Sequence, residues 1–179
     1  MLESGHSSSF FRLLQSSGLL HLIFPHLIPF MEGEEGETIF AYLSKADLIQ
    51  NQFGKSALER PILTACLLFP IFEKELKAAQ ASSEQPLHLG EITLAVHKLI
   101  HEVVTTSFSR FPKRLSALMS QVMINQFRLT PLIPKKGGFK WRFIESRDFP
   151  DALKLLKIRS LLQPELKEIY AKWMEAFKE

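Results

Sequence analysis

The fold of this 179-residue chain is decided by one stretch, Ala57-Leu-Glu-Arg-Pro-Ile-Leu-Thr-Ala-Cys-Leu-Leu-Phe-Pro-Ile-Phe-Glu-Lys-Glu-Leu-Lys-Ala-Ala-Gln80. Its apolar content predicts a long helix in the core. Pro61 fits the first turn, where a proline removes no helical hydrogen bond, whereas Pro70 predicts a kink or break near Phe69. Cys66 is the single cysteine, so no disulfide can form within the chain and we expect a buried, inert thiol.

Helices are also predicted on both sides of this stretch, because apolar residues recur at three- and four-residue spacing and long alternating runs are missing. Residues 19–31 form a short corner broken by Pro25 and Pro29. The other expected helices are one that starts near Ser7 and ends before Gly18, two over about residues 37–52 and 91–105, one that begins at Pro112, one from Asp148 to about Leu161, and one opened by Pro164. The fold class is therefore all-α, a compact single domain over residues 1–179 with about seven to nine helices.

Two groups of side chains resemble metal ligands. His97 and His101 share one helix face, but no glutamate of a HExxH zinc motif lies between them and no third ligand is evident. The run Glu32-Gly-Glu-Glu-Gly-Glu37 lacks the Asp and Asn ligands of a calcium loop. We interpret it as a solvated turn that places negative charge at a helix N-terminus, and we expect no metal and no cofactor in this chain.

Charge is distributed unevenly along the chain. Residues 1–106 carry 7 Lys or Arg against 12 Asp or Glu, and residues 107–160 carry 12 against 3. The second segment therefore has a net charge of +9 in a chain whose total is +3. Such a block attracts polyanions and is typical of nucleic-acid binding, although a solvated basic surface is the simpler alternative.

Basic and aromatic residues interleave within this segment. Lys113 and Arg114 follow Pro112 at a helix start, and a loop over residues 130–141 mixes lysines with Phe139. Such a loop can hold phosphates and stack an unpaired base, or it can be a surface loop pinned by a buried Trp and Phe. The candidate RNA-binding residues are Lys113, Arg114, Arg128, Lys135, Lys136, Lys140, Trp141 and Arg142.

Common catalytic signatures are missing from the sequence. There is no GxxxxGK[ST] phosphate loop, GxGxxG turn, CxxC pair or GxSxG elbow. The only aspartates are Asp47, Asp148 and Asp151, and none lies in a strand-like segment that could present paired carboxylates to two metal ions. We therefore predict no catalytic residues, and a free-standing enzyme is disfavoured.

No segment is predicted to cross a membrane. The most apolar stretches, residues 19–31 and 62–72, are shorter than the roughly 20 residues that a spanning helix needs. The N-terminus has neither the basic start nor the apolar core of a secretory signal. With its single cysteine, the chain is expected to be a cytoplasmic protein with no membrane partner.

The order of several short segments resembles bacterial poly(A) polymerases, polynucleotide adenylyltransferases of the nucleotidyltransferase superfamily. The segments that carry the resemblance are Leu2-Glu-Ser-Gly-His6, Phe11-Arg-Leu-Leu-Gln-Ser-Ser-Gly-Leu-Leu20, Phe24-Pro25, Ala65-Cys-Leu-Leu-Phe-Pro70, Phe111-Pro-Lys-Arg-Leu115, Gln126-Phe-Arg-Leu129 and Asp148-Phe-Pro-Asp-Ala-Leu-Lys-Leu-Leu-Lys-Ile-Arg159. Together they cover roughly residues 2–160. The run Met123-Ile-Asn-Gln-Phe-Arg128 departs from the family pattern, and the family's basic tail is missing.

The resemblance implies that this chain is the C-terminal helical region of such an enzyme. Residues 1–106 would be its neck and body, and residues 107–179 its basic, RNA-binding part. A catalytic head, absent from this chain, would carry the catalytic carboxylates and bind ATP and Mg²⁺, so the chain alone is expected to be inactive. The expected partners are that head and single-stranded RNA 3′ ends.

Two other functions remain open. CCA-adding tRNA nucleotidyltransferases share the ancestry of the family, so the equivalent region of such an enzyme is one alternative. A helical scaffold that docks a protein partner through its basic segment is the other.

Overall fold

The structure of the chain, a computed structural model, describes residues 2–54, 57–83, 87–107, 111–131 and 141–178. Every regular element within these residues is helical, which confirms the all-α fold class. In chain order the elements are the 3₁₀ turn Leu2–Ser4, α1 (Ser7–Ser16), α2 (Leu20–Ile23), the 3₁₀ turn Pro25–Leu27, α3 (Ile28–Met31), α4 (Glu35–Phe53), α5 (Arg60–Ala81), α6 (Leu89–Ile100), the π-helical turn His101–Thr105, α7 (Lys113–Leu129), α8 (Trp141–Ile144), α9 (Phe149–Leu162) and α10 (Leu166–Lys178).

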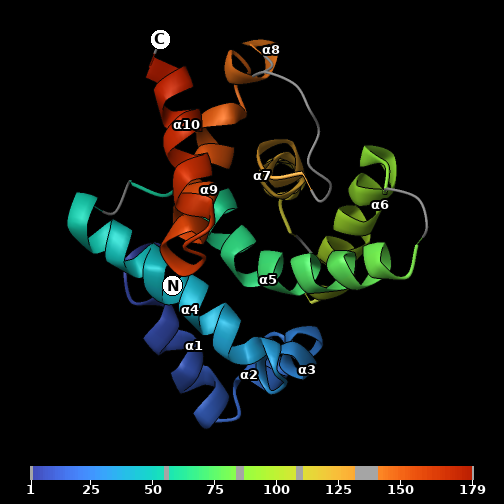
Figure 1. The fold of residues 1–179 in the computed structure, drawn as a ribbon. Coiled ribbons are helices and arrows are strands. Elements are labelled where there is room, and N and C mark those ends of the chain that lie inside the picture. The colour runs from blue at the N-terminus through green and yellow to red at the C-terminus, as the bar shows by residue number, and fades with distance from the viewer. Residues whose placement is uncertain (1, 55–56, 84–86, 108–110, 132–140, 179) are drawn as a thin grey trace.

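Helix α5 is the core of the molecule, as the sequence predicts. All its residues from Pro61 to Glu73 are buried, and α4, α6, α7 and α9 all pack against it (Figure 1). A break at Pro70 does not occur, because α5 continues to Ala81. Packing on several sides outweighs the roughly 3 kcal/mol that an interior proline costs a helix. Cys66 is fully buried, as expected, and burial raises the pKa of its thiol.

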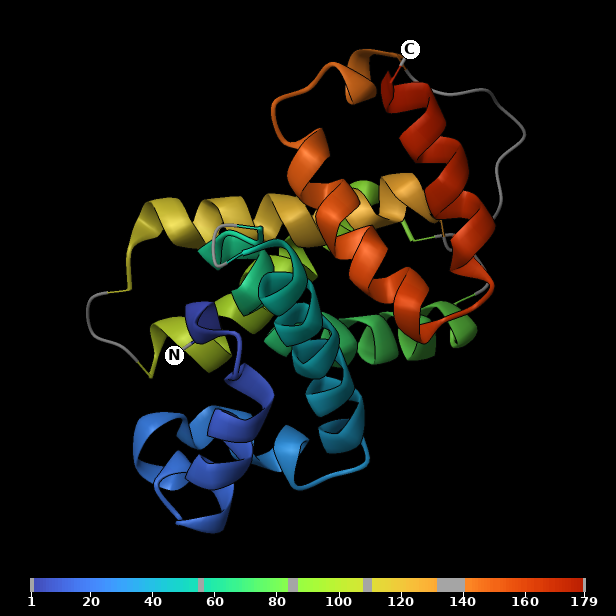
Figure 2. The ribbon, with the colours of Figure 1, turned by 90° about the vertical axis from the view of Figure 1, so that its left-hand side faces the viewer.

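The remaining helices lie at opposite ends of this centre. Helices α1 to α3 form one end, and α8 and α10 form the other (Figures 1 and 2). The larger hydrophobic cluster includes residues of α7 and, from α9, Leu155 and Ile158, so the main core crosses the charge boundary at residue 106. A smaller cluster joins the end of α7 to α8, α9 and α10. There the indole of Trp173 donates to the Leu129 carbonyl at 3.1 Å, which docks the last helix.

A buried polar network connects α5, α7 and α9. The guanidinium of Arg159 donates to Glu73 at 2.7 Å, and both residues are buried. Arg159 also donates to Thr130 Oγ1 at 2.8 Å and to Gln126 Oε1 at 3.3 Å. Gln163 donates to the second carboxylate oxygen of Glu73 at 3.2 Å. Charges this deeply buried are tolerated because each is paired and hydrogen-bonded.

We predict that Arg159→Met lowers the free energy of unfolding by about 3 kcal/mol, because the one cation that then remains near Glu73 among the described residues is Lys77, at 3.5 Å. Urea denaturation followed by circular dichroism measures this loss. The double variant Glu73→Leu/Arg159→Met should regain most of it, since no unpaired charge remains. A single variant as stable as the wild type would contradict the role of the pair.

Candidate nucleic-acid interface

Helix α7 presents cations at both of its ends. It begins after the extended residue Pro112 and buries an apolar face that includes Met119 and Met123. Lys113 and Arg114 are exposed in its first turn, and Arg128 is exposed in its last. With a rise of about 1.5 Å per residue, Lys113 and Arg128 lie about 22 Å apart along the helix. The structure therefore separates the predicted residues into two groups rather than one site.

The second group gathers where α7 ends and α8 begins. The Arg128 guanidinium lies 5.3 Å from the centroid of the Phe143 ring, within range of a cation–π interaction. Phe143 is buried, and it holds α8 in place by packing edge-to-face on Phe149. Trp141 and Arg142 on α8 are exposed, Trp141 by 54%. The alternative of a buried Trp141 is therefore wrong, and its ring is accessible to a ligand.

The described residues include only some of the predicted ones. Lys135, Lys136, Lys140 and Phe139 lie outside the described residues. One basic residue that the sequence reasoning did not single out belongs with the second group. Arg147 is exposed in the short connection between α8 and α9. Arg147 could have been predicted as a further RNA-binding candidate, because it lies within the +9 segment and close to Arg142 in sequence.

The cations of the two charge segments differ in their partners. Five in the acidic segment pair with carboxylates: Arg12 with Glu37 at 3.0 Å, Arg60 with Glu3 at 2.9 Å, Lys74 with Glu34 at 3.4 Å, Lys77 with Glu73 at 3.5 Å, and Lys98 with Glu102 at 3.8 Å. Five exposed cations of the basic segment form no ion pair within the part of the chain that the structure describes: Lys113, Arg114, Arg128, Arg142 and Arg147. Their charge is left for an external anion.

Two other cations of the basic segment pair with carboxylates inside the protein. Arg159 is buried with Glu73, and Lys154 lies 3.3 Å from Asp151. A third, Lys157, forms no ion pair within the described residues, and its amine lies 4.6 Å from the centroid of the Phe53 ring on α4. The segment's net charge of +9 therefore overstates the charge that is free at the surface.

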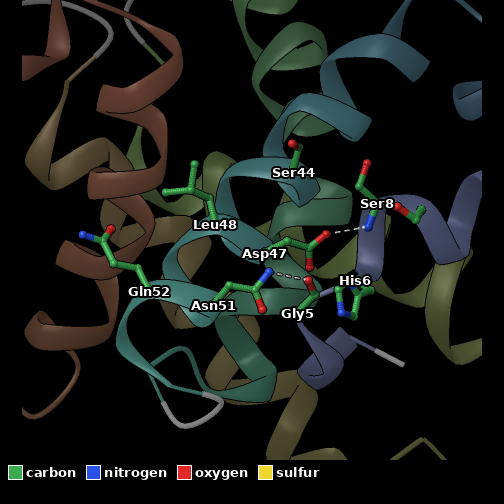
Figure 3. A pocket seen from close by; sticks show the side chains of 9 residues that line it. Gly5, His6, Ser8, Ser44, Asp47, Leu48, Asn51 and Gln52 are labelled. Atoms are coloured by element: carbon green, nitrogen blue, oxygen red, sulfur yellow. Dashed lines mark hydrogen bonds between the residues drawn. The ribbon is translucent and has the colours of Figure 1, made fainter.

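A polar hollow of about 640 Å³ lies where the start of α1 meets α4 (Figure 3). Its carboxylate, Asp47, is 8% exposed and accepts hydrogen bonds from the Ser7 amide at 2.8 Å, the Ser7 hydroxyl at 2.7 Å and the Ser8 amide at 2.9 Å. Asn51 donates to the Gly5 carbonyl at 2.9 Å. The start of α1 is thus capped by Asp47, from a distant part of the sequence, and not by the serines that precede its apolar residues. This carboxylate has a structural role.

Metal ligation receives no support from the described residues. Within them no group of three or more His, Cys, Asp or Glu side chains could hold a metal ion. His97 and His101 are exposed on one side of α6 and its π-helical extension, and the Nδ1 atom of His97 lies 3.4 Å from the Ser120 hydroxyl. Across the same residues, no helix has the length and apolar character that crossing a membrane requires.

Comparison with known proteins identifies no family. Neither a scan against protein-family models nor a search of curated proteins finds a match to this chain. An interpretation of its function therefore depends on the residues themselves and on the resemblance in their order.

We predict that Asp47→Ala lowers the free energy of unfolding by about 2 kcal/mol, the upper range for a helix cap, because three donors lose their acceptor. Chemical denaturation measures the change. The matched control is Ser44→Ala, an exposed position that lines the same hollow and should leave stability unchanged. Equal stability of the two variants would show that the cap contributes little.

Proposed function

We propose that this chain is a non-catalytic, RNA-binding region of a poly(A)-polymerase-like enzyme. The observation that carries the proposal is the set of five exposed cations on and beside α7 and α8 that have no carboxylate partner among the described residues. Four of the five are arginines, whose planar guanidinium groups match phosphate oxygens with two parallel hydrogen bonds. The resemblance to poly(A) polymerases names the class of ligand, an RNA 3′ end.

The proposed mechanism is positioning. The cations neutralise backbone phosphates, and the exposed ring of Trp141 stacks on an unpaired base. Holding the RNA 3′ end in line with ATP bound to a separate catalytic head raises the effective concentration of the reacting groups. The chain itself supplies no acid, base or nucleophile in this scheme.

The same chemistry suits a CCA-adding enzyme, because both kinds of enzyme hold an RNA 3′ end. The two differ in the RNA that is bound: a single-stranded tail in one case and a tRNA acceptor stem in the other. The preferred RNA therefore separates them.

A protein-docking scaffold is the second candidate. The observation that favours it is the exposure of three leucines on α1, α2 and α6: Leu13 by 64%, Leu22 by 79% and Leu94 by 72%. Isolated surface leucines are common in proteins that bind nothing through them. The unpaired cations therefore weigh more heavily in favour of RNA.

The test is fluorescence anisotropy of the purified chain with labelled oligo(A), a tRNA acceptor stem and a duplex DNA, titrated across salt. Binding to oligo(A) that weakens steeply with salt supports the poly(A) polymerase assignment. Preference for the acceptor stem assigns the CCA-adding alternative. No binding to any of the three, even at low salt, overturns the RNA-binding role in favour of a protein-docking scaffold.

We predict that Lys113→Gln reduces the slope of log affinity against log salt for oligo(A) by about 0.7, the value of one phosphate contact on a single strand. The same titration measures the slope. Lys98→Gln is the matched control, since Lys98 is an exposed helical lysine that already pairs with Glu102 at 3.8 Å. Equal slopes for the two variants would exclude Lys113 from the RNA contacts.

A further inference from the structure

Phe53 is an exposed aromatic residue at the end of α4. Its side chain is 59% exposed, and the Lys157 amine of α9 lies 4.6 Å from its ring centroid. The two residues are distant in sequence, and the packing of α4 against α9 brings them together (Figure 2). A cation within about 6 Å of a ring centroid interacts favourably with the ring, so Lys157 fixes the orientation of Phe53.

We propose that Phe53 and Lys157 form a second contact site for single-stranded RNA, hereafter the Phe53–Lys157 platform. The amine lies over the ring, and the large exposed fraction of Phe53 leaves surface on which an unpaired base can stack. The Lys157 amine has no ion pair within the described residues and can reach a phosphate of the same strand. This inference depends on the RNA-binding role proposed above.

Helix α9 connects the platform to the interface around α8. It begins two residues after Arg147, and Lys157 lies about 12 Å along the helix from Phe149. Lys154, which is three residues earlier, shares this side of the helix. Lys154 is partly neutralised, because Asp151 lies at 3.3 Å and Glu59 at 3.9 Å. Among the described residues, the cations here that form no ion pair are therefore Arg147, before α9 begins, and Lys157.

The chemistry of this surface favours a nucleic acid over a protein. An unpaired ammonium group next to an exposed ring matches the two parts of a nucleotide, the phosphate and the base. A protein partner would have to supply an acidic group and an apolar contact at the same spacing.

The experiment measures oligo(A) affinity and its salt dependence for wild type, Phe53→Leu, Phe53→Tyr and Lys157→Gln. Phe53→Leu should weaken binding by about 5- to 100-fold, the usual effect of losing one base–aromatic stack, without changing the salt slope. Phe53→Tyr keeps the ring and should bind like the wild type. Lys157→Gln should reduce the slope by about 0.7, because one phosphate contact is lost.

Leu94→Ala on α6 is the control for trimming an exposed apolar side chain, and circular dichroism checks that each variant is folded. If the wild type binds oligo(A) but Phe53→Leu binds equally well, the platform is wrong and the RNA-binding role stands. If the wild type binds none of the nucleic acids, the RNA-binding role fails and the platform fails with it. A loss in Phe53→Leu that Leu94→Ala reproduces also overturns the platform, since the effect is then not specific to the ring.

Discussion

The alignment of the central helices α5, α7 and α9 depends on the buried ion pair between Arg159 and Glu73. Arg159 fixes α9 against α5 through Glu73 and against α7 through Thr130 and Gln126. Its guanidinium also lies 4.7 Å from the centroid of the Phe69 ring. A buried pair contributes little net stability compared with apolar residues, but its directional bonds are satisfied in one alignment of the helices only. Three of the five exposed cations are on α7, and α9 follows the other two along the chain, so the same bonds fix where positive charge appears on the surface.

Some of this structure could be predicted from the sequence. The burial of α5 follows from an apolar stretch too long for one turn and too dense for a surface helix, and the end of α4 follows from Gly54, whose φ of 96° favours glycine. The sequence left open whether Pro70 kinks or breaks α5, because the local cost of proline is visible in sequence and the packing that keeps the helix continuous is not. The capping of α1 by Asp47 could not be predicted either, because it depends on how α4 packs against α1. The serines that normally cap a helix were present, but the acceptor came from another helix.

The candidate interface was predictable as a segment but not as a surface. A count of charges treats Arg159, Lys154 and Arg142 alike, whereas the fold buries the first, pairs the second and exposes the third. Only tertiary packing makes this distinction. The contact between Phe53 and Lys157 is even harder to predict from sequence. Phe53 comes from the acidic segment of the chain, and nothing near it in sequence indicates nucleic-acid binding.

Within the described residues, five exposed cations form no ion pair, and this is informative because pairing them is not required for stability. Exposed ion pairs contribute about 0 to 1 kcal/mol, so pairing or not pairing a surface cation changes the folded state little. A paired and an unpaired cation differ greatly in the electrostatic potential that they create, since an unpaired cation acts over distances up to the Debye length, about 8 Å at physiological salt.

Lys113 and Arg128 are about 22 Å apart along α7, so the two ends act as separate anion sites. At the 3.4 Å spacing of phosphates along one duplex strand, that distance corresponds to about six phosphates, and to fewer in an extended strand. A strand that contacts both ends of α7 must therefore be several nucleotides long, which matches a single-stranded tail better than a mononucleotide.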